Sequence, residues 1–218
     1  MVKQLIKRKS VKEPEQVPAR LVEMDLELGP LLRVRDVALL SRSNATRYHA
    51  VATPGWNAYS EGLFTLRSQI IGRGRYGEHW ERYFYKNVEG IINKNRNIIV
   101  GFCSVGRALT VGVPQRRKEC GSVVESLCVS ENLELFGSED LPVSSKRMVG
   151  DPLFYYLMVD EDGRVELTCP IVKEKRFADY VERIFLSDGT DFDHPNGRLM
   201  PLDDNDAIDD FAPQIVRK

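Results

Sequence analysis

This sequence has few of the residues that usually build metal or redox sites. Its 218 residues include three histidines and four cysteines, and no two cysteines have C-x-x-C spacing. The missing spacing argues against a zinc knuckle or a redox dithiol. No G-x-x-x-x-G-K-[ST] segment is present, which argues against a Walker-type NTPase. We therefore expect the cysteines to be small buried apolar residues, kept reduced in a cytoplasm.

Long apolar runs are also missing. The run FYYLMV at 154–159 is among the longest, and it is far shorter than a membrane-spanning helix. The basic start of the chain is not followed by the apolar stretch of a secretory signal. We expect a cytoplasmic protein without a membrane role, and its 42% hydrophobic residues are enough for a substantial core.

The small net charge of −1 hides two regions of opposite sign. Residues 61–118 contain eleven lysines or arginines and four glutamates. Residues 187–210 contain eight aspartates and a single basic residue, Arg198. The first region should attract polyanions, whereas the second should repel them or bind cations.

The apolar pattern changes character along the chain. It predicts a strand at 47–53, helices at 61–71, 78–95 and 174–186, hairpins at 97–114 and 153–172, and two strands within 122–137. The hairpin at 153–172 has the clearest signal, because Asp162-Gly163 separates two β-rich runs. This order predicts an α+β fold, with a largely antiparallel sheet built from hairpins and helices packed on one face.

Composition also suggests three parts. Residues 1–20 are expected to be a basic flexible arm, residues 21–186 an α+β globular domain, and residues 187–218 an acidic C-terminal loop and tail. The segment 201–218 mixes acids with spaced apolar residues, which suits a partner-docking segment or a mimic of a nucleic-acid backbone. It is also a candidate to cover the chain's own basic face.

The segment IIGRGRYGEHWERYFYKN at 70–87 is the centre of the functional question. Gly72, Gly74 and Gly77 match G-x-G-x-x-G, the pattern of a dinucleotide-binding turn. However, a helix is predicted before the glycines, where that fold requires a strand, and no acid lies between Glu89 and Glu119 to bind a ribose. The alternatives are a nucleic-acid surface and a plain turn before a helix.

The nucleic-acid interpretation uses the helix predicted at 78–95, in which Trp80, Phe84, Val88 and Ile91 recur at spacings of three and four. Arg82 and Lys86 would lie on the face opposite Trp80. Amide groups at the helix start would add affinity for phosphate. The candidate nucleic-acid-binding residues are Arg73, Arg75, Tyr76, Arg82, Tyr83, Lys86, Arg96, Arg116, Arg117 and Lys118.

Within this set the residues have different expected roles. Arg73, Arg75, Arg82 and Lys86 would bind phosphates, and the tyrosines at 76 and 83 would stack on unpaired bases. The sequence does not distinguish DNA from RNA. In the competing structural interpretation, Trp80 and Phe84 are core residues and the arginines form a solvated face.

An acidic cluster provides an enzymatic alternative. Asp188, Asp191, Asp193 and His194 lie in a turn-rich stretch and could collect Mg²⁺ or Mn²⁺ for a metal-dependent nuclease. The structural alternative is a loop of Asx-turns leading into the acidic tail. A metal-free RNase could use His49 or His79 as general acid or base, although no spacing identifies a partner for either.

The sequence thus favours a DNA-binding or RNA-binding module that is a non-catalytic subunit of a larger cytoplasmic complex, with a protein partner. No cofactor is expected for that module, whereas the nuclease alternative would use magnesium. A third hypothesis is a protein-interaction subunit whose charges serve only solubility and partner choice.

Overall fold

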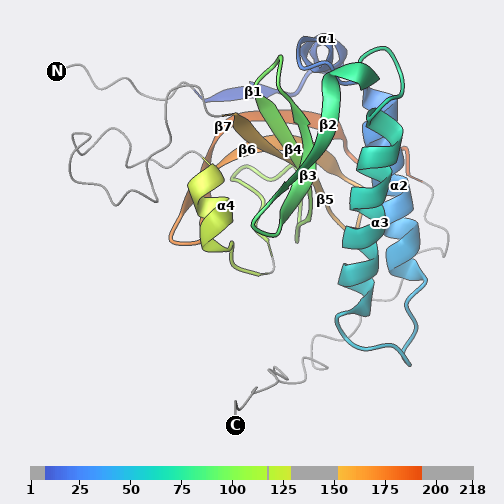
Figure 1. Ribbon diagram of the computed structural model, residues 1–218. Helices are drawn as coiled ribbons and strands as arrows, with labels where there is room; N and C mark the ends of the chain where they lie inside the picture. Colours follow the sequence, from blue (N-terminus) through green and yellow to red (C-terminus); the bar gives the residue numbers. More distant parts are fainter. Residues whose placement is uncertain (1–7, 117, 129–151, 193–218) are drawn as a thin grey trace.

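The structure, a computed structural model, describes residues 8–116, 118–128 and 152–192, and these form a single seven-stranded sheet (Figure 1). The strands are β1 (Lys9–Val11), β2 (Trp80–Tyr85), β3 (Val88–Asn93), β4 (Ile98–Ser104), β5 (Leu153–Val159), β6 (Val165–Lys173) and β7 (Arg176–Ser187). Their order is β1-β7-β6-β5-β4-β3-β2. The β1–β7 and β4–β5 pairs are parallel and the other four pairs are antiparallel.

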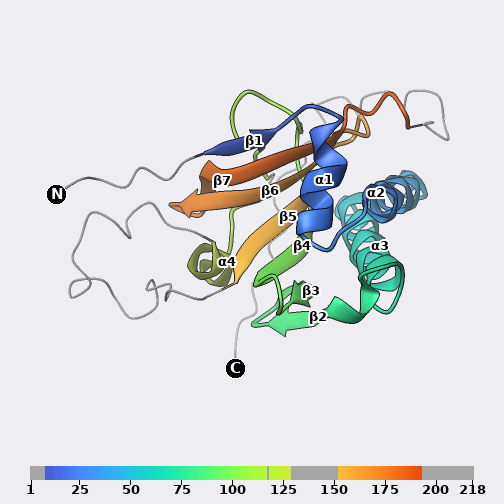
Figure 2. The same cartoon turned by 90° about the horizontal axis from the view of Figure 1, so that it is seen from above.

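Helices cover both faces unequally. The described helices are α1 (Gln16–Glu23), α2 (Leu28–Ser43), α3 (Thr53–Ile70) and α4 (Ser122–Leu127), with a 3₁₀ turn η1 (Gly77–His79). The long helices α2 and α3 lie side by side against one face, and the short α4 lies across the other (Figure 2). The predicted α+β fold with a mostly antiparallel sheet is therefore confirmed.

Alternation along β4 separates two cores. Val100 and Phe102 pack toward the helices with Leu66, while Ile99 and Cys103 pack on the opposite face. Gly62 of α3 allows the closest approach, because a Cβ there would lie 2.8 Å from the Phe102 ring. This contact sets α3 directly on β4, and α3 also contacts the neighbouring strand β3.

The predicted helix at 78–95 is wrong, since this segment forms the β2–β3 hairpin. Lys86 and Asn87 form its two-residue turn, with φ of 46° and 67°. Two consecutive positive φ values fit a turn with the twist of a hairpin. Of the residues whose spacing suggested a helix, Trp80, Phe84 and Ile91 lie on the helix side of the two strands, and Val88 lies on the opposite face.

The predicted helix at 174–186 is also wrong, because these residues form most of β7. Register shifts interrupt the pairing of β7 with β6, so its apolar residues do not alternate strictly. Residues 47–52 form a turn-rich connection and not a strand, and Thr53 begins α3. Of the two strands expected within 122–137, residues 122–127 form α4 instead, and residues 129–137 lie outside the described residues. The second strand expected within 97–114 is not formed.

Other predictions are confirmed. Residues 61–70 lie in α3, and the hairpin at 153–172 is β5–β6.

The expected basic arm at 1–20 includes ordered structure, since β1 and most of α1 lie within it. In the described part of the chain, no helix has the length and apolar character needed to cross a membrane.

Candidate nucleic-acid interface

The G-x-G-x-x-G segment forms a closed loop between a helix and a strand. It follows α3 and precedes η1 and β2, which reverses the strand–loop–helix order of a dinucleotide-binding turn. Gly72 and Gly74 have φ of 67° and 65°, and the Gly72 amide donates to the Gly77 carbonyl at 3.0 Å. A Cβ on Gly77 would lie 2.7 Å from the Gly72 backbone. The loop's own closure therefore accounts for all three glycines.

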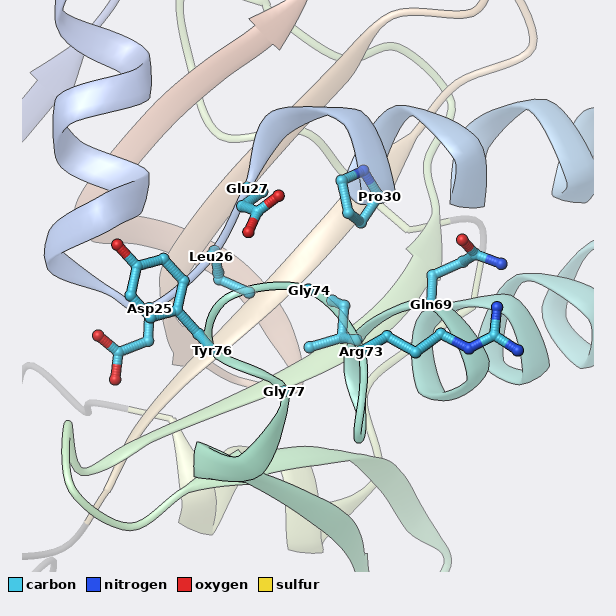
Figure 3. A pocket seen from close by; sticks show the side chains of 10 residues that line it. Asp25, Leu26, Glu27, Pro30, Gln69, Arg73, Gly74, Tyr76 and Gly77 are labelled. Atoms are coloured by element: carbon cyan, nitrogen blue, oxygen red, sulfur yellow. The ribbon is translucent and has the colours of Figure 1, made fainter.

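The two arginines of this loop are exposed. Arg73 lines a small pocket with Gln69 and Pro30, and its side chain extends away from Tyr76 (Figure 3). Arg75 stacks over the Tyr76 ring at 5.4 Å, and its backbone amide donates to Glu27 Oε1 at 3.3 Å. Within the described residues neither guanidinium forms an ion pair, so both remain open to an anion.

The expected helix start at Glu78 is absent. The three-residue turn η1 takes its place, so it provides no row of aligned amides for a phosphate. Affinity for anions at this point must therefore come from the side chains of the loop.

The edge strand β2 carries the next candidates. Trp80, Arg82 and Phe84 alternate onto the helix side of the sheet, so the expected placement of Arg82 opposite Trp80 and Phe84 is wrong. Trp80 is buried, but Phe84 is 60% exposed and is no core residue. The Arg82 side chain is 67% exposed, with only a 3.9 Å contact to Glu89.

The opposite face of β2 is only partly available. Tyr83 packs against the second core, and burial raises the pKa of its phenol, which makes it a poorer stacking surface than expected. Tyr85 is exposed, and the Lys86 ammonium lies 5.2 Å from its ring centroid. Lys86 is in the hairpin turn and not one helical turn from Arg82.

Arg67 of α3 holds this hairpin against the helices. Its guanidinium donates to Glu89 Oε2 at 2.7 Å and to the backbone carbonyls of Tyr83 and Gly90. The Glu89 charge is thereby balanced from within the fold. Arg82 and Phe84 consequently project from a fixed strand.

A buried carboxylate fixes the start of β2. The Asp25 side chain is 2% exposed, and its Oδ2 accepts from His79 Nδ1 at 2.7 Å and Asn93 Nδ2 at 3.1 Å. Its Oδ1 accepts from Arg96 Nε at 2.9 Å and Nη2 at 2.7 Å. The Arg96 hydrogen bonds, with those from His79 and Asn93, lower the pKa of Asp25. We call these four residues the Asp25 cluster.

Arg96 is thus bound to a carboxylate, although 48% of its side chain remains exposed. It stands in the β3–β4 turn, beside the start of β2 and the 72–77 loop. The structure therefore brings Arg75, Tyr76, His79 and Arg96 to one end of the sheet, while Arg82 and Lys86 extend along its edge.

The expected Arg116–Lys118 cluster lies elsewhere. Arg116 stacks over Tyr156 at 5.8 Å and donates to Cys120 Sγ at 3.9 Å, on the face opposite Arg82. Arg117 lies outside the described residues, and Lys118 is exposed near Arg116. The structure does not join these residues to the loop and the helix-side face of β2.

The proposed metal ligands are separated by other roles. Asp191 pairs with Arg35 at 2.8 Å and accepts from Ser187, and the Arg35 bond lowers the pKa of Asp191 to about 2. Asp188 accepts from the Thr190 hydroxyl at 2.7 Å. Asp193 and His194 lie outside the described residues. Over 8–116, 118–128 and 152–192, no three acidic, histidine or cysteine side chains are grouped to hold a metal.

Sequence reasoning missed two features of this site. The sequence spacing places Phe84 in the apolar stripe of a helix, and only the position of β2 at the edge of the sheet explains why the Phe84 ring is exposed. Asp25 lies 54 residues before His79, so no local spacing connects them.

Searches against protein-family models, curated proteins and solved structures found no match to this chain.

Proposed function

We propose that this protein binds single-stranded nucleic acid along β2 and the adjoining 72–77 loop. Arg73 and Arg75 lie before one end of β2, and Lys86 lies at the other end. Six residues of strand at about 3.3 Å each separate these cations by about 20 Å. A single strand following the edge would meet positive charge at both ends and an aromatic ring between them.

The observation that carries this proposal is the exposure of Phe84 between two cations. A phenylalanine that is 60% exposed on an edge strand contributes little to the core. Its ring faces solvent on the same side as Arg82, and Lys86 follows two residues later. Exposed rings beside cations are the elements with which proteins bind unpaired bases and their phosphates.

Fluorescence anisotropy over a salt series would test this proposal with labelled single-stranded and duplex DNA and RNA. Changing Arg73, Arg75, Arg82 and Lys86 together to alanine should flatten the salt dependence by about 0.7 log units per log salt for each phosphate that is no longer bound. Arg33→Ala, an exposed cation on α2, is the matched control and should leave the slope unchanged.

The aromatic contribution has a separate readout. Phe84→Ala should weaken single-strand binding by about 5- to 150-fold, since stacking on one ring contributes roughly 1–3 kcal/mol per base. The salt slope should stay as in the wild type, because no charge is removed. Wild-type affinity and slope in the four-residue variant would disprove the proposal.

A second candidate function rests on the connection between α2 and α3. Tyr48 and Val51 are highly exposed in this connection, and Trp56 is highly exposed in the first turn of α3 that follows it. No acid occurs between Asp36 and Glu61. Exposed aromatic and aliphatic side chains that follow one another closely along the chain are typical of a protein-interaction surface. In this hypothesis the loop inserts into an apolar groove of a protein partner in a larger assembly.

Site-specific photo-crosslinking would test the second candidate. A photoreactive residue at Tyr48 should give one discrete protein adduct in the native host, and Trp56→Ala should remove it. The same residue at Lys118, on the other side of the sheet, is the control. A pattern of adducts identical from both positions would contradict the hypothesis.

A further inference from the structure

The Asp25 cluster holds a histidine and an arginine side by side at the surface. One carboxylate binds His79 through Oδ2 and Arg96 through Oδ1, so the two side chains must be neighbours. The carboxylate is buried, whereas 42% of the His79 side chain and 48% of the Arg96 side chain are exposed. The buried group thus orients two groups that both reach solvent.

This arrangement fixes the tautomer of neutral His79. Because a carboxylate only accepts hydrogen bonds, Nδ1 carries the proton that it donates to Asp25. Nε2 is then the unprotonated nitrogen and can take a proton from a bound molecule. A carboxylate that orients an imidazole in this way is a recurring support for a general base.

The surroundings of His79 suit a nucleotide. The Tyr76 ring centroid lies 6.2 Å from that of His79, and the Arg75 guanidinium stacks on the Tyr76 ring. Arg96 Nη1 is not among the nitrogens bound to Asp25, so it is available to an anionic oxygen. A base, a cation and an aromatic ring therefore meet where the proposed strand path begins.

We propose that the Asp25 cluster cleaves single-stranded RNA without a metal ion, and this inference rests on the proposed nucleic-acid binding. His79 Nε2 removes the proton of a ribose 2′-hydroxyl, and the 2′-oxygen forms a bond to the adjacent phosphorus. The bond from phosphorus to the 5′-oxygen breaks, and that oxygen takes a proton from water. The hydroxide that remains takes the proton from the His79 imidazolium, which returns the histidine to its neutral form. The products are a 2′,3′-cyclic phosphate and a 5′-hydroxyl end.

The other members of the cluster have distinct roles. Arg96 stabilises the negative charge that develops on the phosphoryl oxygens, as positioned cations do in phosphoryl transfer. Asp25 is a positioning residue, because it acts on the substrate only through His79 and Arg96. DNA lacks the 2′-hydroxyl, so it should bind without being cleaved.

The test uses a short labelled RNA of mixed sequence and the matching DNA, with EDTA present and products identified by mass spectrometry. The wild type should yield cyclic phosphate ends from RNA and leave DNA intact. His79→Gln should cut RNA at least about 100-fold more slowly while binding it normally, because general base catalysis contributes 10²- to 10⁴-fold. His49→Gln, an exposed histidine of the α2–α3 connection, should cleave as the wild type does.

Asp25→Asn adds a readout that a purely structural role would not move. It should lower kcat and leave KM unchanged, because an amide orients the imidazole poorly while the binding surface persists. If Asp25→Asn proves unstable, His79→Gln still tests the proposal, provided that its melting temperature equals that of the wild type.

Each result separates the two proposals. Binding of RNA without cleavage overturns the catalytic inference and leaves the proposed function standing. Equal cleavage by wild type and His79→Gln also overturns the inference, since the activity would then lie elsewhere. Failure to bind any oligonucleotide overturns both.

Discussion

Two buried carboxylates in this molecule bind arginine in different ways. Glu166 of β6 accepts from Arg183 Nη2 at 2.6 Å and Nε at 3.0 Å, and both side chains are almost fully buried. Arg183 Nη1 also donates to the carbonyls of Thr110 and Gly112. Asp25 is as deeply buried, yet its partners His79 and Arg96 are each nearly half exposed.

The difference separates a structural pair from a candidate reactive one. Glu166 also accepts from the Leu109 amide, so the pair fastens the connection after β4 to the sheet. The Arg183 nitrogens all donate to groups within the fold, and neither side chain of the pair reaches solvent. In the Asp25 cluster the carboxylate is equally satisfied, but its two partners keep nearly half of their side chains exposed, and neither His79 Nε2 nor Arg96 Nη1 is bonded to Asp25.

The largest expected effect comes from breaking the buried pair. Glu166→Gln should lower the free energy of unfolding by about 3–5 kcal/mol, because it leaves the Arg183 charge buried without a counter-charge. Urea unfolding followed by circular dichroism measures this loss. A change below about 1 kcal/mol would show that solvent reaches Arg183 and would remove the contrast with Asp25.

A smaller and pH-dependent effect is expected at Asp25. Asp25→Asn should destabilise the protein by about 2 kcal/mol at neutral pH, through its hydrogen bonds to charged groups. Folding lowers the pKa of Asp25, so its carboxylate stabilises the fold above the ordinary aspartate pKa of about 3.9. This contribution is lost as the pH falls through the lower folded pKa.

Unfolding curves from neutral to strongly acidic pH would measure that dependence. The gap between wild type and Asp25→Asn should narrow below about pH 4, because asparagine does not titrate. A gap that stayed constant into strong acid would contradict the assigned charge state.

The smallest effect is expected at a largely exposed ion pair of the β2–β3 hairpin. Glu81 and Lys94 form a 2.6 Å ion pair across β2 and the β3–β4 turn, and both side chains are largely exposed. Glu81→Gln should change the free energy of unfolding by less than about 0.5 kcal/mol. A thermal melt checks this, and a larger loss would mean that exposure is a poor guide to the importance of these pairs.

Turn chemistry explains which hairpins could be predicted. Asp162-Gly163 is recognisable in the sequence because glycine at this point is a familiar turn signal. In the Asp162-Gly163 turn only the glycine has a positive φ, whereas the turns Lys86-Asn87 and Glu174-Lys175 have positive φ at both residues and contain no glycine. Residues other than glycine adopt this left-handed backbone conformation only when the surrounding sheet compensates for the strain. The local sequence does not reveal that compensation.

The candidate site divides in the same way. The glycine loop and its exposed arginines follow from local sequence, and the helix predicted ahead of the loop correctly argues against a dinucleotide turn. The link from Asp25 to His79 depends on the connection between α1 and α2 meeting η1 and the start of β2, a contact between distant segments. The availability of Phe84 likewise depends on β2 being last in the strand order.

That edge position has a consequence for solubility. In the sheet formed by the described residues, the outer backbone groups of β2 have no neighbouring strand, and such edges can template aggregation. Arg82 and Lys86 place like charges on this edge, so two copies that approach edge to edge repel each other. Replacing these cations therefore also removes the repulsion that opposes edge-to-edge association. The variants without them should be handled at low protein concentration.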